Sequence, residues 1–369
     1  MRSEPPVIAV TGAGGFIGRN LVVRLRELGA EALPITRETP VDEAWAALGA
    51  AEVVFHLAGA CRPQDPAEFE RTNAYAAWVA EAIEAGGRAP LAIYCSSTRA
   101  DEDTPYGASK RACERAMLEL AARGGATTAI YRLPNVFGKW ARPNYNSAVA
   151  TFCHNLARGL PIRIDDPAAA LSLLYVDDLI DQWARLIAAA PDESGFFEAE
   201  GVHHTTVGEV ADLIAAFAAN RELVGDVGVG LERALYATFV AALPTEAFSY
   251  PLVAHTDPRG SFTEMLKTRG SGQVSFFTAH PGVTRGGHYH HSKVEKFLIV
   301  RGEALFRFRH ILSGDLHEVR TCAEQPVVVE TIPGWTHDVT NVGSDTMVSL
   351  IWANEIFDRE RPDTVMAPL

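Results

Sequence analysis

The chain has 369 residues, more than a single hydrophobic core usually serves, so two domains are expected. A formal net charge of −13 argues against nucleic acid as a partner, and no apolar run is long enough to span a membrane. Because the amino-terminal MRSEPP lacks the basic and apolar regions of a signal peptide and the five cysteines are scattered, we expect a cytoplasmic protein with reduced thiols.

The first motif is a glycine-rich turn between an apolar strand and a helix. Residues 7–10 are apolar, residues 11–18 read TGAGGFIG, and leucines and valines follow at helical spacing. Gly12 allows the turn, Gly15 lets the backbone approach a pyrophosphate, and Gly18 lets the helix pack closely on the strand. The pattern predicts a dinucleotide site at the helix N-terminus; an ordinary turn without a ligand is the alternative.

The next two runs predict further strands of the same sheet. At the end of residues 31–37, where an NAD enzyme offers Asp or Glu to the ribose, this chain has Thr36 and Arg37. A guanidinium suits a 2′-phosphate, which favours NADP(H), unless Arg37 is only a solvated loop charge. Residues 39–51 leave room for one short helix, so this edge of the sheet should be short. Residues 52–60, EVVFHLAGA, are typical of a buried parallel strand in which His56 is packed and hydrogen-bonded.

A hydroxyl-rich strand end and a tyrosine–lysine pair predict redox chemistry. Residues 90–98 end in SST, and Tyr106 and Lys110 follow at i and i+4 on one helix face. An ammonium lowers the pKa of a nearby phenol, so the tyrosine can exchange a proton with a carbonyl or alcohol while a nicotinamide moves the hydride. Ser97 or Thr98 would bind the substrate oxygen. An isolated YxxxK also occurs by chance.

TGAGGFIG, HLAG, SST and YGASK together resemble the extended branch of the short-chain dehydrogenase/reductase superfamily, as do YRLPNVFG at 131–138 and LLYVDDL at 173–179. The resemblance implies a Rossmann-type doubly wound parallel sheet, with Tyr106 as acid/base, Lys110 as its partner, and Ser97 or Thr98 as the third member. One departure is that Tyr106 lies only eight residues after Thr98, so the usual substrate-contacting loop is nearly absent. The residues expected to bind NADPH are Gly12, Gly15, Phe16, Ile17, Gly18, Thr36, Arg37, Leu57, Ala58 and Lys110.

Short β-type runs replace the helical patterning after Pro244, which predicts domains of residues 1–246 and 252–369, the second a sandwich or barrel. Glycine-framed His288, His290 and Glu295 lie in it, followed by His337. On a strand, the two residues of an HxH pair point to the same face. Three imidazoles and one carboxylate suit a divalent transition metal, for which we expect Zn(II).

This spacing resembles the cupin superfamily over residues 255–365, which implies a fold class of α/β plus β, the Rossmann-type sheet followed by a cupin β-barrel. His291 is expected at the rim, although it could compete as a ligand. Residues 257–264, DPRGSFTE, resemble the DxRGxFxE segment of cupin-fold epimerases acting on nucleotide-linked 4-keto sugars.

The fusion resembles bifunctional capsular-polysaccharide enzymes that make UDP-2-acetamido-2,6-dideoxy-β-L-talose. That resemblance implies C3 epimerisation of a UDP-4-keto-hexose at the cupin, then NADPH reduction of C4 at Tyr106. The UDP-sugar is the expected partner, and we also expect a homodimer. Two alternatives stay open: a nucleotide-sugar 4-reductase or 4-epimerase with a structural cupin, and a non-catalytic sensor of dinucleotides or metabolites. Without the resemblance, composition and spacing predict only an NADP(H) carbonyl reductase fused to a metal-binding β-barrel.

Overall fold

The structure of the chain, a computed structural model, describes residues 6–61, 63–219, 221, 223–252, 254–257, 260–263, 266–268, 272–355 and 360–369. It divides into two compact units: Met1–Phe137 with Leu171–His204, and Gly138–Ala170 with Thr205–Leu369. The domain limits expected from the sequence, 1–246 and 252–369, stay a prediction. No helix among the described residues has the length and apolar character needed to cross a membrane.

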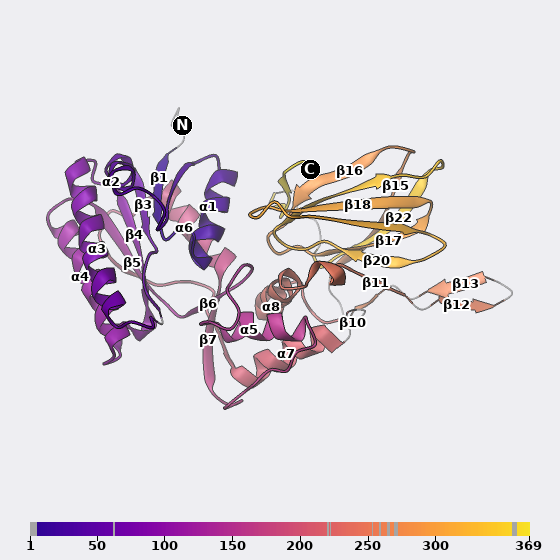
Figure 1. Ribbon diagram of the computed structural model, residues 1–369, viewed down its shortest axis with the longest axis horizontal. Helices are drawn as coiled ribbons and strands as arrows, with labels where there is room; N and C mark the ends of the chain where they lie inside the picture. Colours follow the sequence, from indigo (N-terminus) through magenta and orange to yellow (C-terminus); the bar gives the residue numbers. More distant parts are fainter. Residues whose placement is uncertain are drawn as a thin grey trace. The chain divides into compact units, whose positions relative to one another are not determined.

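The first unit is a parallel sheet between two layers of helices (Figure 1). The strand order is β2-β1-β3-β4-β5-β8, and every adjacent pair is parallel. Its elements are β1 (Val7–Thr11), α1 (Phe16–Glu27), β2 (Glu31–Ile35), α2 (Val41–Ala50), β3 (Val53–His56), α3 (Ala67–Gly86), β4 (Leu91–Ser97), the 3₁₀ helix η1 (Thr98–Asp101), α4 (Pro105–Ala122), β5 (Thr127–Leu133), β6 (Asn135–Phe137), β7 (Ala170–Tyr175), α6 (Val176–Ala188), β8 (Gly195–Phe197) and β9 (His203–Thr206).

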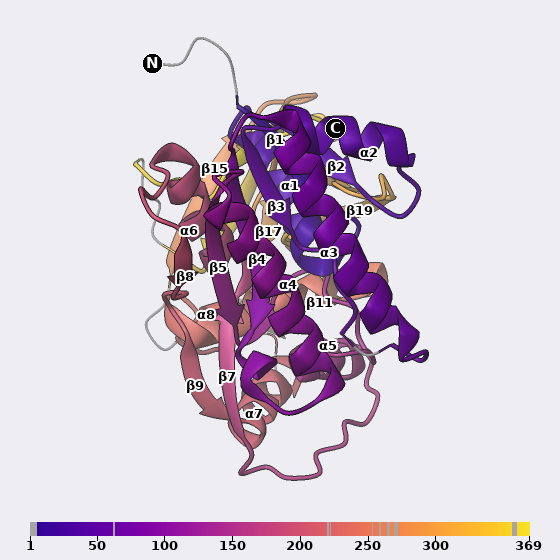
Figure 2. The same cartoon turned by 90° about the vertical axis from the view of Figure 1, so that its left-hand side faces the viewer.

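Both faces of this sheet are buried, and alternate strand residues serve the two helical layers. Ile8 and Val10 pack with Trp183 of α6, whereas Ala9 between them packs with Val79 of α3. This two-sided burial is why the strands read as continuous apolar runs. In Figure 2 α3 and α4 lie in front of the strands, over the face opposite α1 and α6. The doubly wound α/β fold is confirmed, and the sheet ends at β2 as its short connection predicted.

The order of the strands reverses between β1 and β3, which are neighbours in the sheet although β2 separates them in the sequence. In open parallel sheets, ligands bind outside the carboxyl ends of the strands at such a switch point. The TGAGGFIG turn follows β1, and the HLAG motif begins at the end of β3. The fold therefore brings both motifs to one end of the sheet.

His56 is a core residue, as the sequence predicted. It is 1% exposed, and its Nδ1 lies 2.8 Å from the Thr11 hydroxyl of the neighbouring strand. Burial, aided by the positive charge of Lys110, lowers the pKa of His56 from 6.5 to about 3. At neutral pH the ring is therefore uncharged inside the sheet.

The lowered pKa predicts acid sensitivity of the first unit. Between the two pKa values the unfolded chain binds more protons than the folded one, so stability falls as the pH falls from 6.5 towards 3. From about pH 7.5 to about pH 5 we expect His56 alone to remove about 2 kcal/mol from the free energy of unfolding. Urea unfolding of the wild type and of His56→Asn at both pH values measures this. An equal pH dependence in the two proteins would contradict the assignment.

The second unit joins a small group of helices to two antiparallel sheets. Its helices are α5 (Ala148–Leu156), α7 (Val207–Ala219), α8 (Gly230–Ala241) and the 3₁₀ helix η2 (Thr245–Ala247). Its strands are β10 (Leu223–Val224), β11 (Ser249–Pro251), β12 (Ala254–Asp257), β13 (Gly260–Thr263), β14 (Lys267–Thr268), β15 (Gln273–Ala279), β16 (Thr284–Tyr289), β17 (Glu295–Arg301), β18 (Glu303–His310), β19 (Leu316–Cys322), β20 (Val327–Glu330), β21 (Trp335–Asn341), β22 (Met347–Ala353) and β23 (Val365–Met366).

Two five-stranded sheets form the cupin part, in the orders β11-β20-β17-β22-β15 and β19-β18-β21-β16-β23. Their inner side chains pack against each other: the ring centre of Phe297 on β17 lies 5.5 Å from that of Phe306 on β18 and 6.4 Å from that of His337 on β21. Hydrogen bonding does not close them into one barrel within the described residues. Of the predicted DPRGSFTE segment, Pro258, Arg259 and Glu264 lie outside the described residues.

Candidate functional site

Close backbone packing at the first turn makes glycine necessary at two positions. Gly12 has φ +70°, and a Cβ there would lie 2.7 Å from the amide nitrogen of Ala58; at Gly18 it would lie 2.3 Å from the Gly12 carbonyl oxygen. The turn therefore packs closely against the HLAG segment and the start of α1. No described side chain caps α1 at Gly15, and its first turn holds no acid, so its N–H groups and positive dipole end are available to an anion. This arrangement fits a dinucleotide pyrophosphate.

The end of β2 lies against the same turn. The amide of Ala13 donates to the Ile35 carbonyl at 3.3 Å, which places Thr36 and Arg37 immediately beside the glycines. The Thr36 hydroxyl donates to the Glu38 carboxylate at 2.6 Å. This hydrogen bond, with a smaller contribution from Arg37, lowers the pKa of Glu38. Sequence reasoning missed Glu38, which offers an acid where a ribose hydroxyl would be recognised.

Tyr106 occupies the first turn of α4. The Thr104 side chain caps this helix by accepting the Gly107 N–H at 3.1 Å, and Pro105 is the first helical residue. A Cβ at Gly107 would lie 2.3 Å from the Glu102 carbonyl oxygen, because η1 packs directly on this turn. The eight-residue spacing is thus accommodated by direct contact of η1 with α4.

Lys110 lies between Tyr106 and the HLAG segment. Its Nζ donates to the Cys95 carbonyl at 2.9 Å, lies 5.8 Å from the centre of the Tyr106 ring, and would lie 3.6 Å from a Cβ at Gly59. Burial raises the pKa of Tyr106, whereas Lys110 and a hydrogen bond with Ser97 lower it, and burial dominates. The phenol is therefore protonated at neutral pH, contrary to the simple expectation of a lowered pKa, and a protonated phenol is suited to donate to a ketone.

The three hydroxyls at the end of β4 have different surroundings. Ser96 is buried and donates to Glu114 at 2.5 Å, whereas Ser97 helps to lower the pKa of the Tyr106 phenol and accepts the Arg99 N–H at 3.2 Å. Thr98 is exposed and borders a pocket of about 550 Å³ that Arg132 and Phe196 also line. Of the two candidates, Ser97 is the one that influences the pKa of the phenol; its role and that of Thr98 stay predictions.

The buried Glu114, which sequence reasoning missed, hydrogen-bonds to the end of β4. Glu114 on α4 is 4% exposed, and it accepts two hydrogen bonds from Arg132 at 2.9 and 2.8 Å in addition to that of Ser96. Asn73 plays a similar part from α3, because its side chain hydrogen-bonds with the Ser109 hydroxyl beside Lys110. A carboxylate on the apolar face of a helix is the signal that could have revealed Glu114.

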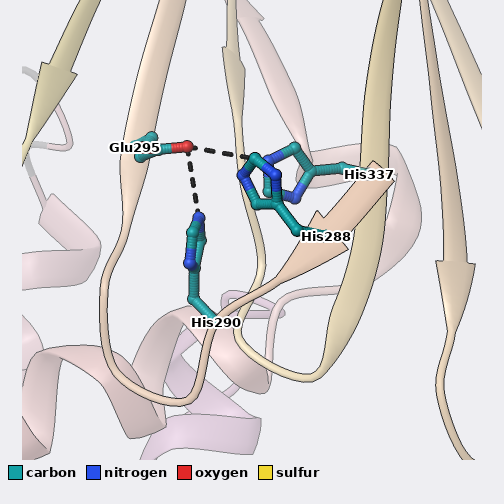
Figure 3. A group of neighbouring side chains, drawn as sticks. All are labelled: His288, His290, Glu295 and His337. Carbon is teal, nitrogen blue, oxygen red and sulfur yellow. Dashed lines mark hydrogen bonds and ion pairs between the residues drawn. The ribbon is translucent and has the colours of Figure 1, made fainter. Parts of the chain in front are cut away.

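The second unit brings the four predicted metal ligands together between its two sheets (Figure 3). His288 on β16 is opposite His337 on β21, His290 follows β16, and Glu295 begins β17 in the facing sheet. The four ligand atoms lie within 4.8 Å of one another. The carboxylate Oε2 is 3.3 Å from His290 Nε2 and 3.6 Å from His337 Nε2. Tetrahedral zinc with bonds of 2.0–2.2 Å places its ligands about 3.4 Å apart.

The protonation of these groups fits a divalent cation. Burial and the neighbouring histidines lower the pKa of His288 from 6.5 to about 4, and burial lowers the pKa of His337. Burial would raise the pKa of Glu295, but hydrogen bonds from His290 and His337 outweigh it and hold that pKa well below the usual range. Neutral imidazoles and an ionised carboxylate are the ligand forms that a transition metal requires. The competing ligand His291 is not in the cluster.

Comparisons with known proteins place both units in families. The model of the NAD dependent epimerase/dehydratase family matches residues 8–195, just over half of the chain. The chain belongs to this epimerase/dehydratase family. In addition, residues 255–365 match the polysaccharide biosynthesis C-terminal domain.

Relatives match nearly the whole length of the chain. It is 49% identical over 361 residues to the UDP-2-acetamido-2,6-beta-L-arabino-hexul-4-ose reductase of Pseudomonas aeruginosa, covering 97% of each chain. It is similar to the crystal structure of the capsular polysaccharide assembling protein CapF of Staphylococcus aureus, with 39% identity, a TM-score of 0.68, and coverage of 98% of this chain and 100% of that one. WbmF of Bordetella bronchiseptica, at 22% identity and a TM-score of 0.52 over 59% of this chain and 79% of its own, shares the fold.

Proposed function

We propose that the chain is a bifunctional enzyme of capsular or surface polysaccharide precursor synthesis. Its cupin part epimerises C3 of a UDP-4-keto-2-acetamido-2,6-dideoxyhexose, and its first unit then reduces C4 with NADPH. The observation that carries the proposal is the presence in one chain of Tyr106 beside Lys110 and of a cluster of three histidines and one glutamate. The name of the Pseudomonas relative, a reductase of a UDP-linked 4-keto sugar, supports this substrate class.

In the proposed reduction, the side chains of the first unit donate one proton and hold the ketone in position. When bound, the nicotinamide supplies the hydride that adds to C4. The Tyr106 phenol donates its proton to the ketone oxygen, which becomes the alcohol, and Lys110 stabilises the phenolate that remains. Ser97 holds the ketone oxygen by a hydrogen bond beside the phenol. Burial keeps Tyr106 protonated until the carbonyl arrives.

In the cupin part, His288, His290, Glu295 and His337 would hold a divalent transition metal, for which we propose Zn(II). When bound, the metal supplies a Lewis acid that makes the proton next to a ketone more acidic. Because C3 is acidic only while C4 is a ketone, epimerisation must precede reduction. The homodimer stays a prediction.

The test is an incubation of wild-type protein with the UDP-4-keto sugar in deuterated water, with and without NADPH. We expect deuterium at C3 without the cofactor and a reduced, deuterated product only with it. A reduced product without deuterium would indicate a simple 4-reductase with a structural cupin. Failure to oxidise NADPH with the sugar would favour the non-catalytic sensor.

Arg37 is the residue on which the proposed preference for NADPH depends. In Arg37→Ala we expect kcat/KM for NADPH to fall about 10-fold or more, because a hydrogen bond to a charged group contributes about 1.5–3 kcal/mol. The value for NADH should change little. Arg26→Ala, an exposed arginine on α1, is the matched control. An unchanged ratio of the two cofactors, together with loss of NADH use in Glu38→Ala, would show that Glu38 selects NADH.

A further inference from the structure

We propose that the carboxy-terminal strap, residues 360–369, completes the metal centre, and that Asp363 is the residue that positions its ligand loop. The inference rests on the proposed metal function and goes beyond it, because Asp363 is not a ligand. The loop in question, residues 290–294, joins β16 to β17 and carries His290. The residues that hold it lie about 70 positions away in the sequence.

The strap runs along the histidine strand. Its β23 pairs antiparallel with β16, with Met366 opposite His288 and Val365 opposite Tyr289. The Ala367 N–H donates to the Gly287 carbonyl at 2.8 Å, and the Thr336 hydroxyl donates to the Ala367 carbonyl. These contacts fix the strap beside the two strands that supply His288 and His337.

The Asp363 carboxylate accepts hydrogen bonds from the backbone N–H groups of the ligand loop. Its Oδ1 accepts the His291 N–H at 2.8 Å, and its Oδ2 accepts the N–H groups of Ser292 and Lys293 at 2.7 Å each. The Ser292 hydroxyl also donates to Oδ2, at 3.0 Å. Successive N–H groups converging on one carboxylate impose a single conformation on the loop, because charge-assisted hydrogen bonds are stronger than neutral ones.

The Asp363 backbone also sets the orientation of a ligand ring. Its carbonyl oxygen contacts His290 Nδ1, and since a carbonyl can only accept, Nδ1 must carry a hydrogen. Nε2, which lies 3.3 Å from Glu295 Oε2, is then the ring nitrogen left to bind a metal. Beside it, Lys293 Nζ donates to the Thr364 hydroxyl at 3.0 Å and lies 3.5 Å from Glu295 Oε1. The strap therefore orients His290 and holds a charge next to Glu295.

Other contacts keep the loop attached when Asp363 changes. The Gly334 N–H donates to the His290 carbonyl at 3.0 Å, and the Val294 N–H donates to the Asn354 side chain at 2.9 Å. Asparagine at 363 is the same size but places an amide donor against loop donors. We therefore expect Asp363→Asn to loosen the loop without removing it.

The experiment measures metal affinity of the full-length protein with Zn(II), by competition with a chromophoric chelator, and the visible spectrum of its Co(II) form. In Asp363→Asn we expect Zn(II) affinity to fall about 10- to 100-fold, as when partners of metal ligands are removed elsewhere, with an altered Co(II) spectrum. Met366→Ala, an exposed residue of the same strap, should match the wild type in both measurements. Circular dichroism of the metal-free proteins checks the fold.

Should Asp363→Asn fail to fold, Ser292→Ala removes the hydroxyl that donates to Asp363 Oδ2 and keeps the backbone N–H, and we expect it to weaken Zn(II) binding about two- to tenfold. Zn(II) affinity within twofold of the wild type and an unchanged Co(II) spectrum in the folded variant would overturn the inference alone. A wild-type protein that binds no Zn(II) would overturn the proposed metal function and this inference with it.

Discussion

Replacing Tyr106 by phenylalanine is expected to lower kcat for NADPH-dependent ketone reduction by about 100- to 10,000-fold, the usual contribution of a positioned proton donor. The ring and its packing remain, so the KM for NADPH should change little. The physical reason is that the alkoxide formed at C4 then has no phenol to protonate it, while Lys110 and Ser97 stay in place. Steady-state kinetics with the already epimerised ketone measures the loss.

Tyr75→Phe is the matched control for Tyr106→Phe. Tyr75 lies on α3 of the same unit, where it stacks on Trp78 at 5.4 Å between ring centres, and no role in the reaction is assigned to it. We expect near wild-type kinetics from this variant. A Tyr106→Phe enzyme that retains a kcat within about tenfold of the wild type would exclude the phenol as the proton donor.

Glu295→Gln is expected to lower Zn(II) affinity by more than about 100-fold and to abolish deuterium incorporation at C3. The amide keeps the shape of the side chain but removes the one anion of the ligand set, and it places a donor or a weak acceptor between His290 and His337. Turnover of the already epimerised ketone should persist, because Tyr106 and Lys110 are unaltered. Metal analysis and the deuterium assay measure the two losses.

Glu303→Gln, an exposed glutamate at the start of β18, controls for the change of charge. If Glu295→Gln loses metal but still exchanges the C3 proton and turns over both ketones, the metal is structural. If the wild type gives no exchange while it reduces the ketone, the cupin part has no epimerase role. The second outcome selects the nucleotide-sugar 4-reductase with a structural cupin, one of the alternatives that the sequence left open.

Motifs whose geometry is local could be predicted from the sequence. The turn after β1 needs Gly12 and Gly18 because of atoms in the same turn and the adjacent strand, and the pairing of Tyr106 with Lys110 follows from helix periodicity. His288 and His290 meet because two residues separated by one are close in any extended segment. The doubly wound fold could also be predicted, because strands that are buried on both faces appear in the sequence as continuous apolar runs.

Other properties depended on residues that are distant in the sequence. The pKa of Tyr106 is a balance between burial and Lys110, and no motif specifies how deeply a side chain is buried. Glu114 is held by Arg132 across two elements, and Asp363 binds a loop about 70 residues earlier. The residue types and their local spacing determined which chemistry the chain carries. Only tertiary packing decided which groups are desolvated, which hydrogen bonds orient them, and hence which protonation state each one holds, because those energies arise from neighbours that the chain brings together on folding.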